Sequence, residues 1–185
     1  MRLLAVSGSL RRDSHNARLL RAAAQQLPPG AELEFYDGLK QIPPFDEDDE
    51  AHPGPEVERW RAAIDAADAV LIATPEYNSS LPGQLKNAVD WASRPKADAA
   101  LRNKPVAVVG ASKSMFGALW AQAELRKVLA SAGARVLDAE LAVATAHEAF
   151  DDDALIDPDL SEALGTITAD LVEMARERSD AISRI

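Results

Sequence analysis

The sequence contains no cysteine and only three histidines. The missing thiols exclude disulfides, thiolate metal sites, iron–sulfur clusters and cysteine nucleophiles. The histidines are His15, His52 and His147, and no two of them have the spacing of paired metal ligands on one helix. A metal enzyme is therefore disfavoured, no metal-binding residue is expected, and any redox chemistry requires a bound cofactor.

Positive charge is also scarce. Lys and Arg number 20 against 30 Asp and Glu, and the resulting net charge of −10 repels a phosphate backbone, so no nucleic acid partner is expected. The first six residues carry one charge and a short apolar run, far less than a signal peptide or the ~20 residues of a membrane span. We expect a cytoplasmic protein without a membrane partner, folded as one domain over residues 1–185.

Apolar runs and helical periodicities alternate along the chain. Short apolar runs predict five strands, at residues 3–6, 31–36, 69–73, 105–109 and 135–137. Apolar residues at helical spacing predict helices near residues 16–27, 55–67, 82–92 and 118–132, and from residue 160 onward. This order predicts an α/β fold with a five-stranded parallel sheet and helices on both faces. The acidic, proline-rich stretch Leu39 to Pro55 is expected to be a solvated loop.

Ligands of such sheets bind beyond the carboxyl ends of the strands. The loop after the first strand carries the hydroxyls of Ser9 and Ser14 together with Arg11, and it leads into a helix whose positive end favours a phosphate. It lacks the glycine patterns of dinucleotide and triphosphate loops, so a terminal monophosphate such as that of FMN fits better. Alternatively, Ser14 or Asn16 only caps the helix, and this loop alone leaves both interpretations open.

The loop after the third strand, residues 74–83, has an aromatic and an amide side chain at its tip. Tyr77 offers a stacking surface and Asn78 offers hydrogen-bonding groups for a flat heteroaromatic ligand. The alternative is a turn built by Pro75 and Asn78, with Tyr77 covering the end of the sheet. A third loop, which contains Ser112 and Lys113, follows the fourth strand at the same edge.

Taken together, these loops resemble the NADPH-dependent FMN reductase family, which includes bacterial quinone and chromate reductases. The resemblance covers residues 1 to about 140 and rests on Gly8-Ser9-Leu10-Arg11 with Ser14 and Asn16, and on Pro75-Glu76-Tyr77-Asn78, Leu81-Pro82-Gly83, Leu85-Lys86-Asn87-Ala88 and Asp90-Trp91. It implies a flavodoxin-like three-layer sandwich that holds FMN noncovalently, with NADPH or NADH as hydride donor. It also implies a homodimer or homotetramer and a small-molecule acceptor: quinones, free flavin, azo compounds or chromate.

The resemblance assigns the cofactor-binding residues as well. It implies that the FMN phosphate is held by Ser9, Arg11, Ser14 and Asn16. It implies that the isoalloxazine and ribityl contact Pro75, Glu76, Tyr77 and Asn78, largely through the backbone, and that the ring lies beside Ser112 and Lys113. No catalytic residue is expected, because the flavin itself carries the hydride chemistry.

Four positions depart from the family pattern, and two others point to a partner. Lys113, Ser114 and Ala118 stand where the family often has proline or glycine, which leaves the acceptor range and the choice of nucleotide open. His15 replaces an apolar or aromatic residue and is interpreted as structural. Trp91 and Trp120 lie on helices whose core faces other residues already fill, which hints at a subunit interface.

Three other functions compete with this interpretation. A flavodoxin-like electron carrier, which would not oxidise NAD(P)H directly, suits the acidic surface, but Tyr77 is its one obvious flavin-stacking aromatic. A phosphoacceptor signalling module needs an acidic pair where Ser7-Gly8-Ser9 stands. A nucleoside-transferring enzyme with Glu76 as nucleophile lacks a recognisable partner carboxylate.

Overall fold

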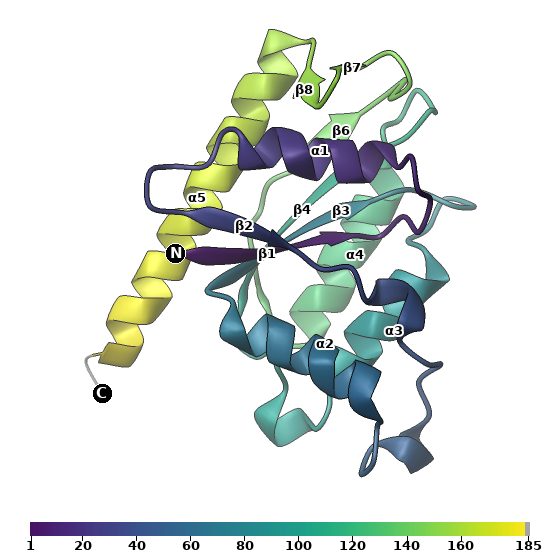
Figure 1. Cartoon of the computed structure of the whole chain (residues 1–185), viewed down its shortest axis with the longest axis vertical. Helices are drawn as coiled ribbons and strands as arrows, with labels where there is room; N and C mark the ends of the chain where they lie inside the picture. The colour runs from purple at the N-terminus through teal and green to yellow at the C-terminus, as the bar shows by residue number, and fades with distance from the viewer. Residues whose placement is uncertain (184–185) are drawn as a thin grey trace.

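A parallel sheet forms the centre of the computed structural model, which describes residues 1–183. Its strands lie in the order β2-β1-β3-β4-β5, and the first four of them are labelled in Figure 1. Their bounds are Arg2–Ser7 (β1), Glu32–Phe35 (β2), Ala69–Thr74 (β3), Pro105–Ala111 (β4) and Arg135–Val136 (β5). β3 and β4 are buried along their whole length, which explains their unbroken apolar runs. The predicted five-stranded parallel sheet is confirmed, and its order is that of flavodoxin-like folds.

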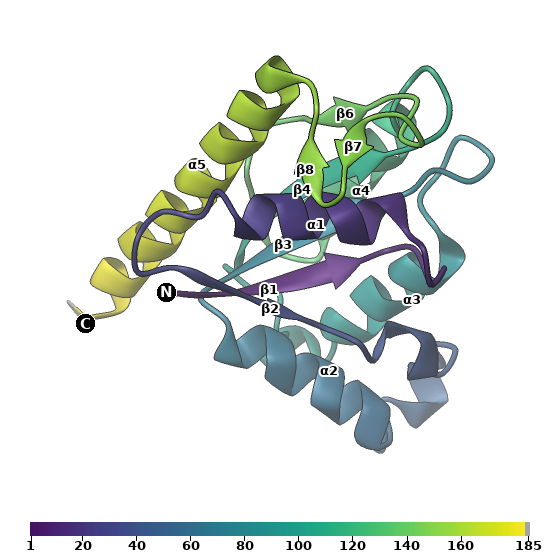
Figure 2. The same cartoon turned by 45° about the horizontal axis from the view of Figure 1, so that its top comes forward.

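Helices cover both faces of the sheet (Figures 1 and 2). One face carries α1 (His15–Ala24) and α5 (Pro158–Ser183), and the other carries α2 (Pro55–Ala66), α3 (Gly83–Ala92) and α4 (Leu119–Ser131). Two separate apolar cores result, one around Leu20 and Leu164 and the other around Ile64, Leu85 and Leu125. Across residues 1–183, no helix is both long and apolar enough to cross a membrane.

Three short elements near the carboxyl edge of the sheet escaped the sequence analysis. β6 (Ala142–Val143) pairs with the end of β4, while β7 (Phe150–Asp151) and β8 (Ala154–Leu155) form an antiparallel hairpin. Each strand has two residues, too few to show a period in the sequence. The hairpin lies against α1 (Figure 2), where Arg18 Nε donates to the carbonyl of Asp152 at 2.7 Å.

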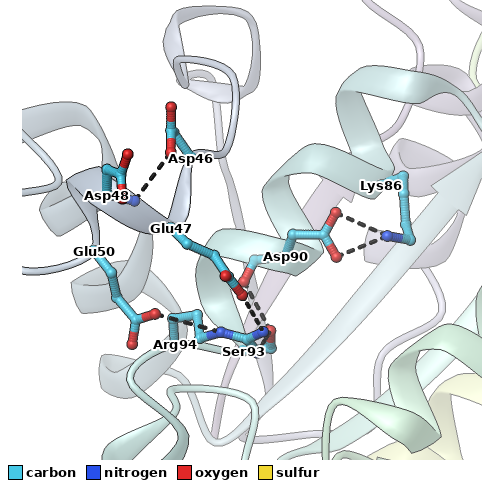
Figure 3. A network of polar contacts seen from close by, with 8 residues as sticks. All are labelled: Asp46, Glu47, Asp48, Glu50, Lys86, Asp90, Ser93 and Arg94. Atoms are coloured by element: carbon cyan, nitrogen blue, oxygen red, sulfur yellow. Dashed lines mark hydrogen bonds and ion pairs between the residues drawn. The ribbon is translucent and has the colours of Figure 1, made fainter.

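The segment between β2 and α2 is more structured than the expected solvated loop. It contains two short 3-10 helices, Leu39–Gln41 and Glu47–Asp49, and the side chain of Leu39 is buried. Its acidic part is held by Arg94, whose guanidinium lies 3.9 Å from Glu47 and 3.5 Å from Glu50 (Figure 3). Apolar anchors therefore fix the first half of the segment, and ion pairs restrain the exposed second half.

Trp91 owes its position to the same segment. Its indole Nε1 donates to the carbonyl of Pro43 at 2.9 Å, and its ring meets that of Phe45 edge-on at 4.8 Å. The side chain is only 1% exposed. The sequence-based hint that Trp91 belongs to a subunit interface is wrong, because the partner of this indole lies within the same chain.

Candidate functional site

Three loops meet at the carboxyl edge of the sheet around a pocket of about 200 Å³. They follow β1, β3 and β4, the three adjacent strands at the centre of the sheet. Nine of the ten predicted site residues line the pocket: Ser9, Arg11, Ser14, Asn16, Pro75, Glu76, Tyr77, Ser112 and Lys113. His15 and Ala111 complete the lining, whereas Asn78 lies just outside it, exposed at the tip of its loop.

The first loop needs a glycine where it leaves β1. A Cβ on Gly8 would lie 2.8 Å from Leu85 Cδ2 and 3.3 Å from Pro75 Cδ, so a larger residue would push the first two loops apart. The loop then turns into α1, where the Ser14 hydroxyl accepts a hydrogen bond from the amide of Ala17 at 3.3 Å. Ser14 therefore caps α1, as one of the two interpretations predicted, and it also faces the pocket.

Asn16 connects the first loop to the third. Its Nδ2 donates to the carbonyl of Ala111 and its Oδ1 accepts from the amide of Ala111, both at 2.9 Å, and the side chain is 2% exposed. Ala111 is the last residue of β4, so this pair fixes the start of α1 against the end of the strand. Asn16 thus shapes the pocket from behind through the backbone that it holds.

The second loop ends in a tight turn. The amide of Tyr77 donates to the carbonyl of Ser80 at 3.0 Å, the amide of Ser80 donates back at 3.1 Å, and Asn78 and Ser79 between them have φ of 52° and 60°. Two consecutive positive φ values are typical of the two-residue hairpin turns that favour asparagine at the first position. The turn foreseen around Asn78 is confirmed, but the Tyr77 ring is 49% exposed and presents a stacking surface to solvent.

Glu76 has a structural role that the sequence analysis missed. Its Oε2 accepts a hydrogen bond from the amide of Ala121 at 3.1 Å, in the first turn of α4. The cap residue of that helix is Ala118, whose methyl group cannot accept a hydrogen bond. Glu76 therefore caps α4 from another segment, and its carboxylate also suits the positive end of the helix dipole. No signal in the sequence pairs these two positions, which lie 45 residues apart.

The third loop carries an exposed apolar surface. Met115 is 74% exposed, and the rings of Phe116 and Trp120 contact each other at 4.7 Å while each remains nearly half exposed. Ala118, one of the departures from the family pattern, is fully buried and close to Gly110, where an added Cβ would lie 3.0 Å from the Ala118 Cβ. Of the three departures, only Lys113 and Ser114 place side chains on the exposed side of the loop.

The pocket is locally positive in a strongly acidic protein. Arg11 and Lys113 line it, and Arg18 lies on α1 about one turn after His15, the first residue of that helix. Burial lowers the pKa of His15, and the charges of Lys113, Arg11, Arg18 and His147 lower it further. This cationic field, together with the amino end of α1, favours an anionic ligand group at this side of the pocket.

A larger hollow of about 710 Å³ lies at the opposite edge of the sheet, between the carboxyl ends of α3 and α4. It is lined by cationic side chains that include Arg94, Lys96, Arg102 and Lys127. Arg94, Lys96 and Arg102 follow α3 in the chain, and the last turns of α3 and α4 themselves carry no basic residue. None of the ten predicted site residues reaches this hollow.

Comparison with known proteins decides the family. The sequence profile described as NADPH-dependent FMN reductase matches residues 1–148. The chain belongs to the NADPH-dependent FMN reductase family. The family region therefore includes β1 to β6 and all three pocket loops, whereas the β7–β8 hairpin and α5 follow it.

Individual members of the family are similar over most of the chain. An NAD(P)H-dependent FMN reductase of Pseudomonas aeruginosa is 45% identical over 154 residues, which cover 82% of each chain. A 2-hydroxy-1,4-benzoquinone reductase of a Burkholderia species is 43% identical over 131 residues, covering 70% of each. The solved structure of FerB, a flavoenzyme NAD(P)H:(acceptor) oxidoreductase from Paracoccus denitrificans, has a TM-score of 0.82 at 30% identity and covers 95% of this chain and 97% of that one.

Proposed function

We propose that this family member holds FMN noncovalently in the three-loop pocket and uses NADPH or NADH to reduce quinones or free flavin. The convergence of nine predicted cofactor residues in one pocket carries the proposal. Relatives described as an FMN reductase and as a benzoquinone reductase support the donor and the acceptor class. Azo compounds and chromate remain further candidate acceptors.

The side chains at one end of the pocket fit a monophosphate. Ser9 and Ser14 offer hydroxyl groups, Arg11 offers positive charge, and α1 directs its amino end at them. Ser112 and Lys113, which the resemblance placed beside the ring, are assigned to this end instead, because the charge of Lys113 acts on His15 at the start of α1. The one carboxylate in the lining, that of Glu76, is occupied by the amide of Ala121. Together with Asn16, which positions this end of the pocket, these residues are the proposed phosphate contacts.

The other end of the pocket is proposed to receive the ring and ribityl chain. Pro75, Glu76, Tyr77 and Asn78 form the loop there, and the hairpin turn fixes the backbone groups that would contact the flavin edge. FMN, when bound, accepts hydride from the nicotinamide and passes reducing equivalents to the acceptor. The protein supplies orientation and a fixed set of hydrogen-bonding groups, so no catalytic residue is proposed.

A homodimer or homotetramer is part of the proposal, as is a cytoplasmic location. The exposed apolar side chains of Met115, Phe116 and Trp120 support an interface close to the pocket. Light scattering at several protein concentrations tests the oligomer. A concentration-independent monomer would contradict this part while leaving the pocket assignment intact.

An absorbance experiment tests the function directly. The purified protein is mixed with FMN, and NADPH and then NADH are added under anaerobic conditions, followed by a benzoquinone. We expect the bound flavin to bleach with at least one nucleotide and to recover its colour with the quinone. Tight FMN binding without bleaching would support the electron carrier, and failure to bind FMN would overturn the proposal.

A pair of variants tests the residue assignment. Arg11→Gln and Lys113→Gln should each weaken FMN binding severalfold while changing riboflavin binding little, because riboflavin lacks the phosphate. Lys40→Gln, on the remote 3-10 helix, is the matched control for the loss of one exposed positive charge. Equal loss of FMN and riboflavin affinity would contradict the placement of the phosphate.

A further inference from the structure

His15 is the pocket residue whose chemistry the family pattern does not supply. It is the first residue of α1, it lines the phosphate end of the pocket, and its ring lies nearly parallel to that of Phe150 at a centroid distance of 6.5 Å. Within residues 1–183, its Nδ1 is buried and has no hydrogen-bond partner. The residue as a whole is only partly buried and lines the pocket, so a ligand bound there can meet the accessible edge of the imidazole.

The groups around the imidazole come from every element packed against it. Arg11 precedes α1, Arg18 follows one turn later, Lys113 comes from the third loop, and His147 comes from the segment before β7. Arg18 is bound by the Asp152 carbonyl and lies 3.9 Å from the Asp153 carboxylate, so the hairpin partly offsets its charge. Burial and the net positive field both lower the pKa of His15, which favours the neutral imidazole in the absence of an anion.

We propose that His15 is a proton-accepting contact for the cofactor phosphate: it is neutral without FMN and takes up a proton from solvent when the phosphate binds. This inference rests on the proposed function, and it assigns to His15 a role beyond packing on Phe150. No covalent bond changes, and the added proton places a second N–H on the imidazole beside the anion. The ion pair would add to the contacts from Arg11 and Ser14.

His15 would take up a proton because phosphate binding reverses the sign of the electrostatic field at its imidazole. A phosphate dianion placed among Arg11, Lys113 and His15 outweighs the repulsion that these cations exert on a protonated imidazole. It also offers an acceptor to the ring. The pKa of His15 should therefore rise from below its ordinary value to above it on binding, and FMN affinity should increase as the pH falls between these two values.

Calorimetric titration of FMN into the wild-type protein and into His15→Phe measures this proton directly. Titrations at pH 7 in two phosphate-free buffers with different ionisation enthalpies give the number of protons bound with FMN. Phenylalanine keeps an aromatic ring against Phe150, and His15→Gln, which keeps a polar group, is the second variant. We expect the wild type to take up close to one proton more per FMN than either variant.

Affinities measured from pH 8.5 to 5.5 give an independent readout. FMN has its own phosphate titration, which cancels in the ratio of the variant Kd to the wild-type Kd. We expect this ratio to be constant near pH 8.5 and to grow as the pH falls, by up to about tenfold per pH unit. Riboflavin, which has no phosphate, should show a constant ratio, and His52→Gln, outside the pocket lining, should behave as wild type.

The outcomes separate this inference from the function on which it rests. FMN binding with equal proton uptake in wild type and both variants would leave the proposed function intact and make His15 a packing residue. Proton uptake with riboflavin as well would also overturn the inference, since the phosphate would then not be the cause. Absence of FMN binding at every pH would overturn both.

Discussion

Asn16 and Ala111 are separated by 95 residues in the sequence and joined by two hydrogen bonds of 2.9 Å. The asparagine side chain satisfies both backbone polar groups of Ala111, at the position where β4 gives way to the third loop. This pair makes the start of α1 and the end of β4 a single unit beneath the pocket.

Asn16→Ala should destabilise the fold by about 2–4 kcal/mol, because it removes two hydrogen bonds and leaves a buried amide and a buried carbonyl without partners. It should also weaken FMN binding by releasing the first loop. Urea unfolding followed by circular dichroism measures the first effect. Ser9→Ala is the control: it should weaken FMN binding with little change in stability. Unchanged stability of Asn16→Ala would contradict the role of this pair.

Glu76→Ala should destabilise the protein by about 1 kcal/mol, the usual cost of a lost helix cap. Glu76→Gln keeps an acceptor for the Ala121 amide and should lose less than half as much. Since Glu76 is a cap and not a nucleophile, Glu76→Gln should keep most of the reductase activity. Loss of activity by several orders of magnitude in Glu76→Gln, with FMN still bound, would instead favour a chemical role for the carboxylate.

Lys104 predicts a pH dependence of stability. Its side chain is 1% exposed, and Nζ donates to the carbonyl of Ala67 at 2.5 Å and to that of Asp65 at 3.3 Å, beyond the end of α2. Burial and, to a lesser extent, the charge of Arg178 lower its pKa from 10.5 to about 8, although Asp65 and Asp68 act in the opposite direction. Above pH 8 the unfolded chain therefore holds a proton that the folded protein has released.

The expected consequence is that the free energy of unfolding rises with pH in the wild type relative to Lys104→Met. The difference should be constant below pH 8 and should grow above it by at most about 1.4 kcal/mol per pH unit. Chemical unfolding of both proteins from pH 6.5 to 9.5 measures it, and other titrating groups cancel in the comparison. A difference that stays flat throughout would show that the lysine keeps its ordinary pKa.

Two glycines should respond to alanine in opposite directions. Gly117, in the third loop, has φ of +54°, and a Cβ there would lie 2.5 Å from the Ala142 carbonyl carbon. Gly117→Ala should therefore destabilise the protein by more than 1 kcal/mol. Gly83 begins α3 with open space around it, so Gly83→Ala should stabilise the protein by up to about 1 kcal/mol. Thermal unfolding of the two variants side by side checks the contrast, and a similar Tm for both would contradict it.

The sequence was sufficient to predict the sheet because its central strands are apolar along their whole length. β3 and β4 are buried on both faces, so their residues show neither alternation nor ambiguity. β6, β7 and β8 could not be predicted, because two-residue strands are set by tertiary contacts. The same reason explains the segment after β2, where Leu39 and Phe45 looked like isolated apolar residues in an acidic loop.

The site was predictable in its residues but not in its connections. Ser14 was foreseen as a cap, and its short spacing to Ala17 makes such a contact local. The pairing of Asn16 with Ala111 and of Glu76 with Ala121 joins positions 95 and 45 residues apart, for which a single sequence contains no signal. The unpartnered nitrogen of His15 was equally hidden, because it depends on how the hairpin and Phe150 close over α1.

The hydrogen bonds of Asn16 to Ala111 and of Glu76 to Ala121 limit which positions of the pocket can change without disturbing its shape. Asn16 joins the first loop to the third, and Glu76 joins the second loop to α4, which follows the third loop. The backbones of the three pocket loops are therefore connected by side-chain hydrogen bonds. A substitution of Asn16 or Glu76 is therefore expected to shift more than one pocket loop. Variation in acceptor preference is therefore expected at exposed side chains of these loops that do not take part in the connecting hydrogen bonds. Met115, Phe116 and Tyr77 are the large apolar or aromatic side chains exposed there. A library restricted to Met115 and Phe116, which lie outside the pocket lining, should alter the range of acceptors while the cofactor cradle, to which Tyr77 belongs, stays intact.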